Sequence, residues 1–384
     1  MSEARRPARI LHLHSSFAPG GKELRSVQLI NAFGRSAEHE IVSADKNQYG
    51  ASKAIKPGLR VRYPRSFPSL TGKPTPRRLL KMAQAMADYD LILTYNWGAM
   101  DAAMAHTAFA ERMGLPPLIH HEDGFNSDEA KKLKRSRNWY RRIALGRSAA
   151  VVVPSHILGR IARQTWSQPA DRVKRIPNGI DVSAFRKKAK RSALPRLIKR
   201  PGEMWLGTMA GLREVKRLDR LVEVVGKLPD NWHLVIFGEG PEREAILETA
   251  DRYEISDRVH LPGHVKDPAK VIGLLDIFAL SSDSEQFPIS VLEAMAAGLP
   301  VAAPDVGDIF AMVAPENEEF IVSPGDRDAF IHAVRTLSAD DVLRERIGKA
   351  NKAKVTAEYG EARMIEAYRD LYNRFLPAHA RLQA

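Results

Sequence analysis

Two glutamates, Glu285 and Glu293, frame the segment with the most potential chemistry in this 384-residue sequence. Pro288 lies between them and suits the first position of a helix, because a proline has no backbone N–H to leave unpaired there. Gly298 and Pro300 form a stop signal, so we expect a short helix that begins at Pro288 and ends just before Gly298. Carboxylates accept hydrogen bonds from vicinal hydroxyls, so one glutamate can hold a sugar and the other a ribose.

The start of this helix is suited to phosphate. Its first backbone N–H groups, at Ile289 and Ser290, have no acceptor within the helix and lie at the positive end of the helix dipole. A helix N-terminus of this kind binds phosphate. A capped core helix with two exposed acids is the alternative interpretation. The whole pattern from Glu285 to Pro300 favours a site for phosphate and sugar hydroxyls.

This segment is similar to the donor-site motif of the retaining glycosyltransferases of family 4, in which two glutamates have the same E-x7-E spacing. The resemblance covers nearly the whole chain and is strongest after residue 150. It implies a GT-B fold, a nucleotide-sugar donor, which we expect to be UDP-linked, retention of anomeric configuration, and no metal or other cofactor. It also implies that Glu285 contacts the donor sugar and that Glu293 holds the ribose. The amides around Pro288, Ile289 and Ser290 would then hold the distal phosphate.

The loop after the first strand of the second half holds candidate cations for the leaving diphosphate. The family places an arginine and a lysine here, and Lys216 matches the lysine. The arginine position is Gly211 in this chain, and Arg213 is the nearest arginine. Arg213 either takes over that role or forms a salt bridge at the rim with Glu214 or Asp219.

Gly238 and Glu239 end a strand and open a helix, in a pattern that could be taken for a dinucleotide fingerprint. The third glycine of that fingerprint is missing, and the pattern stands in the second βαβ unit of its domain, which argues against NAD. The resemblance instead implies that this loop lines the nucleotide pocket. A second pocket loop is expected at Leu261, near the base.

The first half of the chain has two candidate site loops. Gly20 and Gly21 follow the first expected strand, where a glycine-rich turn lets backbone approach phosphate or sugar; an ordinary turn is the alternative. Near residue 120 the family usually has a histidine that contacts the donor sugar or the acceptor. If this segment is aligned with the family on its glycine, Asp123 takes the position of that histidine. If it is aligned on a histidine, His120 or His121 takes it. Asp123 and His121 are our catalytic candidates. Adjacent strand residues point to opposite faces, which argues against a metal site.

Short apolar runs alternate with longer helical patterns, which indicates parallel βαβ units. Candidate strands are residues 10–14, 91–94, 118–121, 151–153, 204–209, 233–237, 259–261, 277–280, 301–303 and 320–322. We therefore expect an α/β protein with two Rossmann-like, doubly wound parallel-sheet domains that face a central cleft. We place an acceptor domain at residues 1–180, a donor domain at 181–360, and a helix that returns to the first domain at 361–384.

The net charge of +13 is concentrated in residues 131–147 and 186–200, each with eight basic residues and no acids. A solvated helix face or linker is one interpretation. The run from Lys131 to Arg147 also contains Trp139, Tyr140 and Ile143, which suits an anionic membrane surface. Nucleic acid is not expected, because no nucleic-acid-binding motif accompanies the charge. With no cysteine, no signal-peptide core and no apolar run of about 20 residues, we expect a cytoplasmic protein, peripheral on the inner face of the plasma membrane.

These features predict a glycosyltransferase that acts on a lipid or a lipid-linked saccharide. Two alternatives use the same nucleotide-sugar site. One is a GT-B sugar-nucleotide epimerase or phosphorylase, and an isomerised nucleotide sugar that forms without any acceptor would support it. The other is a catalytically silent protein that only binds a nucleotide sugar.

Overall fold

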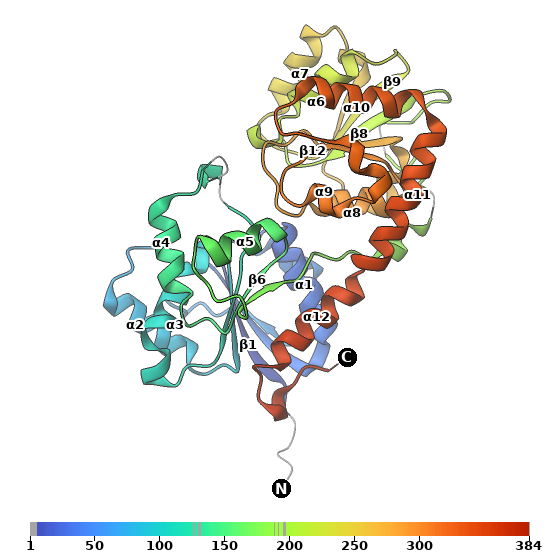
Figure 1. The fold of residues 1–384 in the computed structure, drawn as a ribbon. Helices are drawn as coiled ribbons and strands as arrows, with labels where there is room; N and C mark the ends of the chain where they lie inside the picture. The colour runs from blue at the N-terminus through green and yellow to red at the C-terminus, as the bar shows by residue number, and fades with distance from the viewer. Residues whose placement is uncertain are drawn as a thin grey trace. The chain divides into compact units, whose positions relative to one another are not determined.

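The computed structural model describes residues 6–125, 127–129, 132–187, 189–190, 192–194 and 197–383. The chain forms two compact units, Met1–Asn178 together with Arg363–Ala384, and Gly179–Ala362. Each unit contains one parallel sheet covered by helices (Figure 1). The two Rossmann-like parallel sheets that the sequence predicts are therefore confirmed.

The first unit is built on a seven-stranded parallel sheet in the order β3-β2-β1-β4-β5-β6-β7. The strands are β1 (Ala8–His14), β2 (Ala37–Ser43), β3 (Val61–Arg62), β4 (Leu91–Tyr95), β5 (Leu118–His121), β6 (Ala150–Val153) and β7 (Val173–Arg175). The strand order reverses between β1 and β4. In open α/β sheets, ligands bind at such a switch point, beyond the carboxyl ends of the strands.

Helices cover both faces of the first sheet. They are α1 (Gly21–Phe33), α2 (Pro76–Met86), α3 (Met100–Met113), α4 (Arg135–Ala144), α5 (His156–Gln164) and α12 (Glu361–Asn373). One face is buried under α2 to α5, and the other under α1 and the C-terminal helix α12 (Figure 1). Because Tyr368 and Tyr372 of α12 are buried against this sheet, the last segment of the chain completes the core of the first unit.

The second unit has a six-stranded parallel sheet in the order β10-β9-β8-β11-β12-β13. Its strands are β8 (Met204–Met209), β9 (Trp232–Phe237), β10 (Val259–Gly263), β11 (Ile277–Ala279), β12 (Val301–Pro304) and β13 (Ile321–Val322). Its helices are α6 (Asp219–Gly226), α7 (Arg243–Arg252), α8 (Ile289–Ala296), α9 (Ile309–Met312), α10 (Arg327–Ala339) and α11 (Asp341–Glu358). The switch point of this sheet lies between β8 and β11.

The start of α8 differs from its prediction by one residue. Pro288 is not the first helical residue but the N-cap, because its ψ of 116° is extended rather than helical. The helix therefore begins at Ile289. The shift leaves the amides of Ile289 and Ser290 in the first turn, where a helix has no internal acceptors for its N–H groups.

Candidate active site

An ion pair between Lys216 and Glu285 lies at the switch point of the second sheet. Lys216 ends a short turn after β8, and Glu285 lies in the loop after β11, the strand next to β8. The Lys216 ammonium is 2.5 Å from Oε1 of Glu285, which also accepts a hydrogen bond of 2.7 Å from the hydroxyl of Ser282. The structure therefore brings together two of the predicted catalytic residues, 69 positions apart in the chain.

The backbones of these two loops are tied to each other. The hydroxyl of Ser281 donates to the carbonyl of Lys216 at 2.8 Å, and the amide of Asp283 donates to the carbonyl of Val215 at 2.9 Å. Because both bonds join the loop after β8 to the loop after β11, the positions of Lys216 and Glu285 depend on each other.

Gly307, after β12, supports the Glu285 loop and was not singled out in the sequence. Its φ is +66°, and a Cβ at this position would lie 2.7 Å from the carbonyl oxygen of Glu285. The next residue, Asp308, donates its amide to the carbonyl of Gln286 at 3.0 Å. The sequence signal for this role is a glycine that follows shortly after an apolar strand.

The loops after β8 and β9 contact each other through the Gly-Glu-Gly pattern. Gly238 has a φ of +155°, and a Cβ there would lie 1.9 Å from the carbonyl oxygen of Ala210. Leu212 donates its amide to the carbonyl of Glu239 at 3.0 Å. Leu261 lies inside β10 rather than in a loop. Gly238, Glu239 and Leu261 thus lie at the carboxyl ends of β9 and β10 without any dinucleotide fingerprint.

Arg213 is exposed and stands next to the glycine at the family's arginine position. A Cβ at Gly211 would lie 3.6 Å from Nε of Arg213, so the Arg213 side chain lies over the space that a side chain at position 211 would enter. Asp219 pairs with Arg217 at 2.8 Å. Among the described residues, Arg213 forms no ion pair with Glu214 or with Asp219.

Glu293 is half-buried on α8, about one turn after the helix start at Ile289. Burial raises the pKa of its carboxyl to about 7, because a charged carboxylate loses hydration there. Pro288, Ile289 and Ser290 at the start of the same helix are each partly exposed. One short helix therefore carries a carboxyl group that titrates near neutrality and an N-terminus that can accept an anion.

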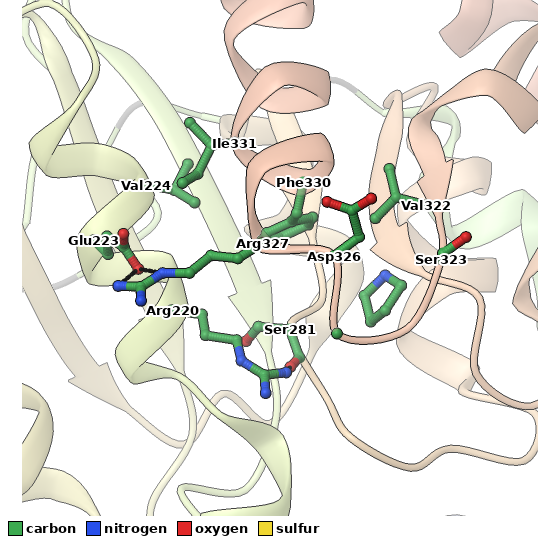
Figure 2. A pocket seen from close by; sticks show the side chains of 12 residues that line it. Arg220, Glu223, Val224, Ser281, Val322, Ser323, Asp326, Arg327, Phe330 and Ile331 are labelled. Atoms are coloured by element: carbon green, nitrogen blue, oxygen red, sulfur yellow. Dashed lines mark hydrogen bonds and ion pairs between the residues drawn. The ribbon is translucent and has the colours of Figure 1, made fainter.

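A small cavity of about 30 Å³ lies between α6 and α10. Figure 2 shows Arg220 beside Ser281, and Arg327 paired with Glu223. A cavity of this size holds about one water, whereas small-molecule sites measure about 300–1,000 Å³. Arg220 instead braces the loop that carries Glu285, because it donates to the Ser281 carbonyl at 3.1 Å and pairs with Asp283 at 2.8 Å.

Asp123 in the first unit is held by an arginine that sequence inspection missed. The Arg25 guanidinium, only 3% exposed, binds both carboxylate oxygens of Asp123, with one contact of 2.9 Å. Arg25 also donates to Oδ1 of Asn178 at 3.2 Å. The amide of Asp123 donates to the side chain of Asn96 at 2.8 Å. Arg25 and Asp123 lie 98 positions apart, so spacing in the sequence carried no signal for the pair.

The glycine turn lies close to this arginine. Gly20 is the N-cap of α1 and Gly21 its first residue. Lys22 contacts Glu23, and burial lowers the pKa of the Lys22 ammonium to about 8. A Cβ at Gly20 would lie 2.7 Å from a carboxylate oxygen of Glu23, so the turn also lets this buried acid fold back toward the chain.

His121, a predicted catalytic residue, lies in the core. Its ring nitrogens are 3.3 Å from the carbonyl of Thr94 and 2.9 Å from the hydroxyl of Tyr372, and its ring stacks on Tyr95. His120 is buried as well, with a ring nitrogen 2.9 Å from the hydroxyl of Thr94. Both histidines are thus buried, and Asp123 is the partly exposed one of these three candidates.

Four of the seven cations that the structure describes in the basic run 131–147 are paired with acids. Arg141 is fully buried and binds Glu129 with two contacts of 3.1 Å. The other pairs are Arg137 with Asp128 and Glu129, Lys134 with Asp128, and Arg147 with Glu111. Lys131 lies outside the described residues. The solvent-exposed face of α4 keeps Arg135 and Arg142 beside Trp139, which is 65% exposed, and Ile143.

Within the described part of the chain, no group of three or more His, Asp or Glu side chains lies close enough together to bind a metal ion. None of the helices described is long and apolar enough to cross a bilayer.

Two family models match most of the chain between them. "Glycosyltransferase Family 4" matches residues 19–184, and "Glycosyl transferases group 1" matches residues 195–354. The chain belongs to family 4 of the glycosyltransferases. It is a glycosyltransferase that uses a nucleotide-sugar donor.

Known proteins are similar over large parts of the chain. N-acetyl-alpha-D-glucosaminyl L-malate synthase of Bacillus anthracis is 24% identical over 278 residues, which are 71% of each chain. A GDP-mannose-dependent alpha-(1-6)-phosphatidylinositol monomannoside mannosyltransferase of Mycobacterium tuberculosis is 28% identical over 76% of this chain and 78% of its own. The crystal structure of Anabaena Alr3699/HepE in complex with UDP has a TM-score of 0.80 at 20% identity, over 95% of this chain and all of that one, and this likeness shows the GT-B fold.

Proposed function

We propose that this chain transfers a hexose from a UDP-linked donor, with retention of configuration and without a metal, to a lipid or a lipid-linked saccharide at the cytoplasmic face of a membrane. The observation that carries the donor site is the Lys216–Glu285 pair at the switch point of the second sheet. An ammonium and a carboxylate near the start of α8 suit a diphosphate joined to a polyhydroxyl sugar.

The proposed reaction is a substitution on one face of the sugar. The bond from the anomeric carbon to the diphosphate oxygen breaks, and the acceptor oxygen bonds to the same face of that carbon. The acceptor proton passes to the departing diphosphate oxygen. Lys216 and the first amides of α8 stabilise the charge that grows on the diphosphate, while Glu285 holds the sugar and Glu293 the ribose.

Arg213 is proposed as the second cation at the diphosphate. Its side chain lies over Gly211, the position where the family has its arginine. The alternative of a rim salt bridge loses support, because Asp219 is engaged by Arg217. An arginine two residues along the chain can thus deliver its guanidinium to the space left by the glycine.

The nucleotide base is assigned to the loop that carries Gly238 and Glu239 and to Leu261 in β10. The similar Anabaena protein was crystallised with UDP, whereas the mycobacterial relative is named for GDP-mannose. We propose UDP for this chain, and we propose that Gly20 and Gly21 contribute backbone contacts to the donor, as the family resemblance implies. Asp123 keeps its proposed role beside the reacting sugar, held in place by Arg25.

The acceptor assignment rests on the exposed face of α4. Trp139 and Ile143 are exposed between Arg135 and Arg142, which is the composition of a helix that lies at an anionic lipid surface. The mycobacterial relative is named for a phosphatidylinositol-based acceptor. These observations support a membrane-borne acceptor.

Donor binding and turnover of single variants test this function. We expect Glu285→Ala and Lys216→Ala each to lower turnover of UDP-glucose about 10²–10³-fold while the protein stays folded, because each removes a group aimed at the reacting centre. Lys349→Ala is the matched control, since Lys349 forms an exposed pair with Glu345 at 2.7 Å in the same unit. A thermal-shift series with UDP and GDP compares the bases, because a ligand at 100 times its Kd adds about 2.7 kcal/mol of stability.

Two results would contradict the proposal. If either folded variant turned over donor as fast as the unmodified protein, the assignment of Lys216 and Glu285 to the donor site would be wrong. An isomerised nucleotide sugar that forms without any acceptor would identify an epimerase instead.

A further inference from the structure

The first unit contains a groove that the donor site does not use. Its volume is about 620 Å³, within the range of about 300–1,000 Å³ that small-molecule sites occupy. One wall is formed by the end of β2 and the loop after it, and the other by residues 63–70, which precede α2. The groove therefore opens at the carboxyl edge of the first sheet, where parallel sheets bind ligands.

The lining of this groove is polar and positively charged above an apolar floor. Six lining side chains carry a hydroxyl or an amide: Ser43, Asn47, Tyr49, Ser52, Tyr63 and Ser69. Two cations, Lys46 and Arg65, also line it, and both are exposed. None of the lining residues that the structure describes is acidic. Hydroxyl and amide groups match a polyhydroxyl ligand, and unopposed cations match an anion.

Two tyrosines give the groove an aromatic wall. The rings of Tyr49 and Tyr63 pack edge to face with their centres 5.1 Å apart, and Tyr63 remains 39% exposed. The hydroxyl of Tyr49 accepts a hydrogen bond of 3.2 Å from the amide of Ser43, which fixes the ring against the end of β2. The apolar C–H face of a sugar ring packs on such a surface, while its hydroxyls reach the polar neighbours.

Hydrogen bonds hold both walls in place. Phe17 donates its amide to the carbonyl of Gln48 at 3.0 Å, and the amide of Ala51 donates to the carbonyl of Phe17 at 3.0 Å. These bonds join the groove to the loop that leads into the Gly20 turn. On the other wall, Arg78 of α2 donates to the carbonyl of Ser69 at 2.9 Å and pairs with Asp101 at 2.6 Å.

We propose that this groove binds the acceptor, and that the acceptor is an anionic saccharide, a sugar that carries a phosphate or a carboxylate. The inference rests on the proposed function and names the substrate class for it. Tyr63 supports the sugar ring, and Lys46 and Arg65 bind the anionic group. A free sugar phosphate and the headgroup of a glycolipid share this chemistry.

Hydrogen exchange of residues 42–52 and 63–70 tests the proposal with defined probes. We expect α-D-glucose 1-phosphate and D-glucuronic acid to protect both segments, and D-glucose to bind at least about tenfold more weakly, because it cannot use the two cations. Phosphatidylinositol vesicles, compared with phosphatidylglycerol vesicles of equal charge, show whether a lipid headgroup serves as well as a free sugar. Equal protection by D-glucose, by inorganic phosphate or by phosphatidylglycerol would overturn the proposal, as would no protection by any probe.

Single variants distinguish binding in the groove from nonspecific attraction of anions to exposed arginines. Arg65→Gln should weaken both anionic sugars at least about tenfold and leave D-glucose unchanged. Arg62→Gln is the matched control, because Arg62 is exposed three residues earlier and does not line the groove. Tyr63→Ala should weaken all sugars, and Tyr63→Phe should restore most of that binding. An unchanged affinity in Arg65→Gln would overturn the proposal.

The same samples distinguish this inference from the donor assignment. UDP-glucose should protect residues 281–293 in the unmodified protein and in Arg65→Gln alike. If UDP-glucose protects that segment while no sugar protects the groove, only the acceptor inference falls. If UDP-glucose protects nothing, the proposed function itself falls.

Discussion

Glu293 differs from the other proposed donor-site residues in its protonation. Burial raises the pKa of its carboxyl to about 7, from an ordinary 4.5. Folding therefore favours the neutral carboxyl, whereas two ribose hydroxyls are best held by the ionised carboxylate, which accepts two hydrogen bonds. Binding and stability make opposite demands on this one side chain.

That conflict has a measurable pH dependence. The folded protein binds more protons than the unfolded chain between pH 4.5 and about 7, so the free energy of unfolding falls as pH rises through this window. Above it, Glu293→Gln should be more stable than the unmodified protein by about 1–3 kcal/mol, measured by urea unfolding. UDP affinity of the unmodified protein should rise over the same window more steeply than that of the variant, because the terminal phosphate of UDP ionises there in both cases. Parallel pH profiles for UDP binding would contradict the ribose assignment.

The sequence did not predict which side chains pair with the site residues. Lys216 and Glu285 were each expected from the family pattern, but their 2.5 Å contact joins positions 69 apart. Arg25, which holds Asp123, carries no local signal, since it lies within an ordinary helix. The contact of His121 with Tyr372 of α12 could not be predicted, because a histidine at a strand end looks the same in the sequence whether it faces a cleft or the core.

Whole elements were predicted where apolar runs are continuous. Every strand of the second sheet was expected, because strands buried on both faces consist mostly of apolar residues. In the first sheet β2, β3 and β7 were missed. Glu38 and Glu40 interrupt β2, β3 has two residues, and β7 is a Val-Lys-Arg triplet, so none of them has the apolar run that identifies a buried strand.

The exposed face of α4 makes a prediction about membranes. The double variant Arg135→Gln/Arg142→Gln should lower partitioning onto phosphatidylglycerol-containing vesicles about tenfold or more, because each arginine near an anionic surface contributes about 1 kcal/mol. Trp139→Ala should weaken binding as well, and Val342→Ala, at an exposed apolar position of α11, should not. Co-sedimentation over a salt series measures this. No binding of the unmodified protein to anionic vesicles at low salt would remove the membrane part of the proposal.

The two units of the molecule differ in what their cores contain. The core of the first unit includes four buried histidines: His12, His14 and His121 contact Tyr95, and His39 contacts His12. Burial lowers the pKa of each of the four imidazoles, that of His39 to about 3. In the described part of the second unit, no histidine is fully buried. Lowering the pH should therefore destabilise the first unit more than the second.

Acid destabilises the first unit because the unfolded chain takes up protons that the buried histidines do not. Below pH 6.5 the histidines of the unfolded chain become charged, while the buried ones stay neutral, so the stability of the first unit is lost as pH falls from 6.5 toward 3. At about pH 5 each such histidine costs about 2 kcal/mol. Native-state hydrogen exchange should show β1 and β2 opening at about pH 5 before the strands of the second unit. His39→Gln should lose about 2 kcal/mol less on acidification from about pH 7.5, whereas His332→Gln, at an exposed position, should behave like the unmodified protein. Simultaneous opening of both units in acid would show that the buried histidines do not control the stability of the first.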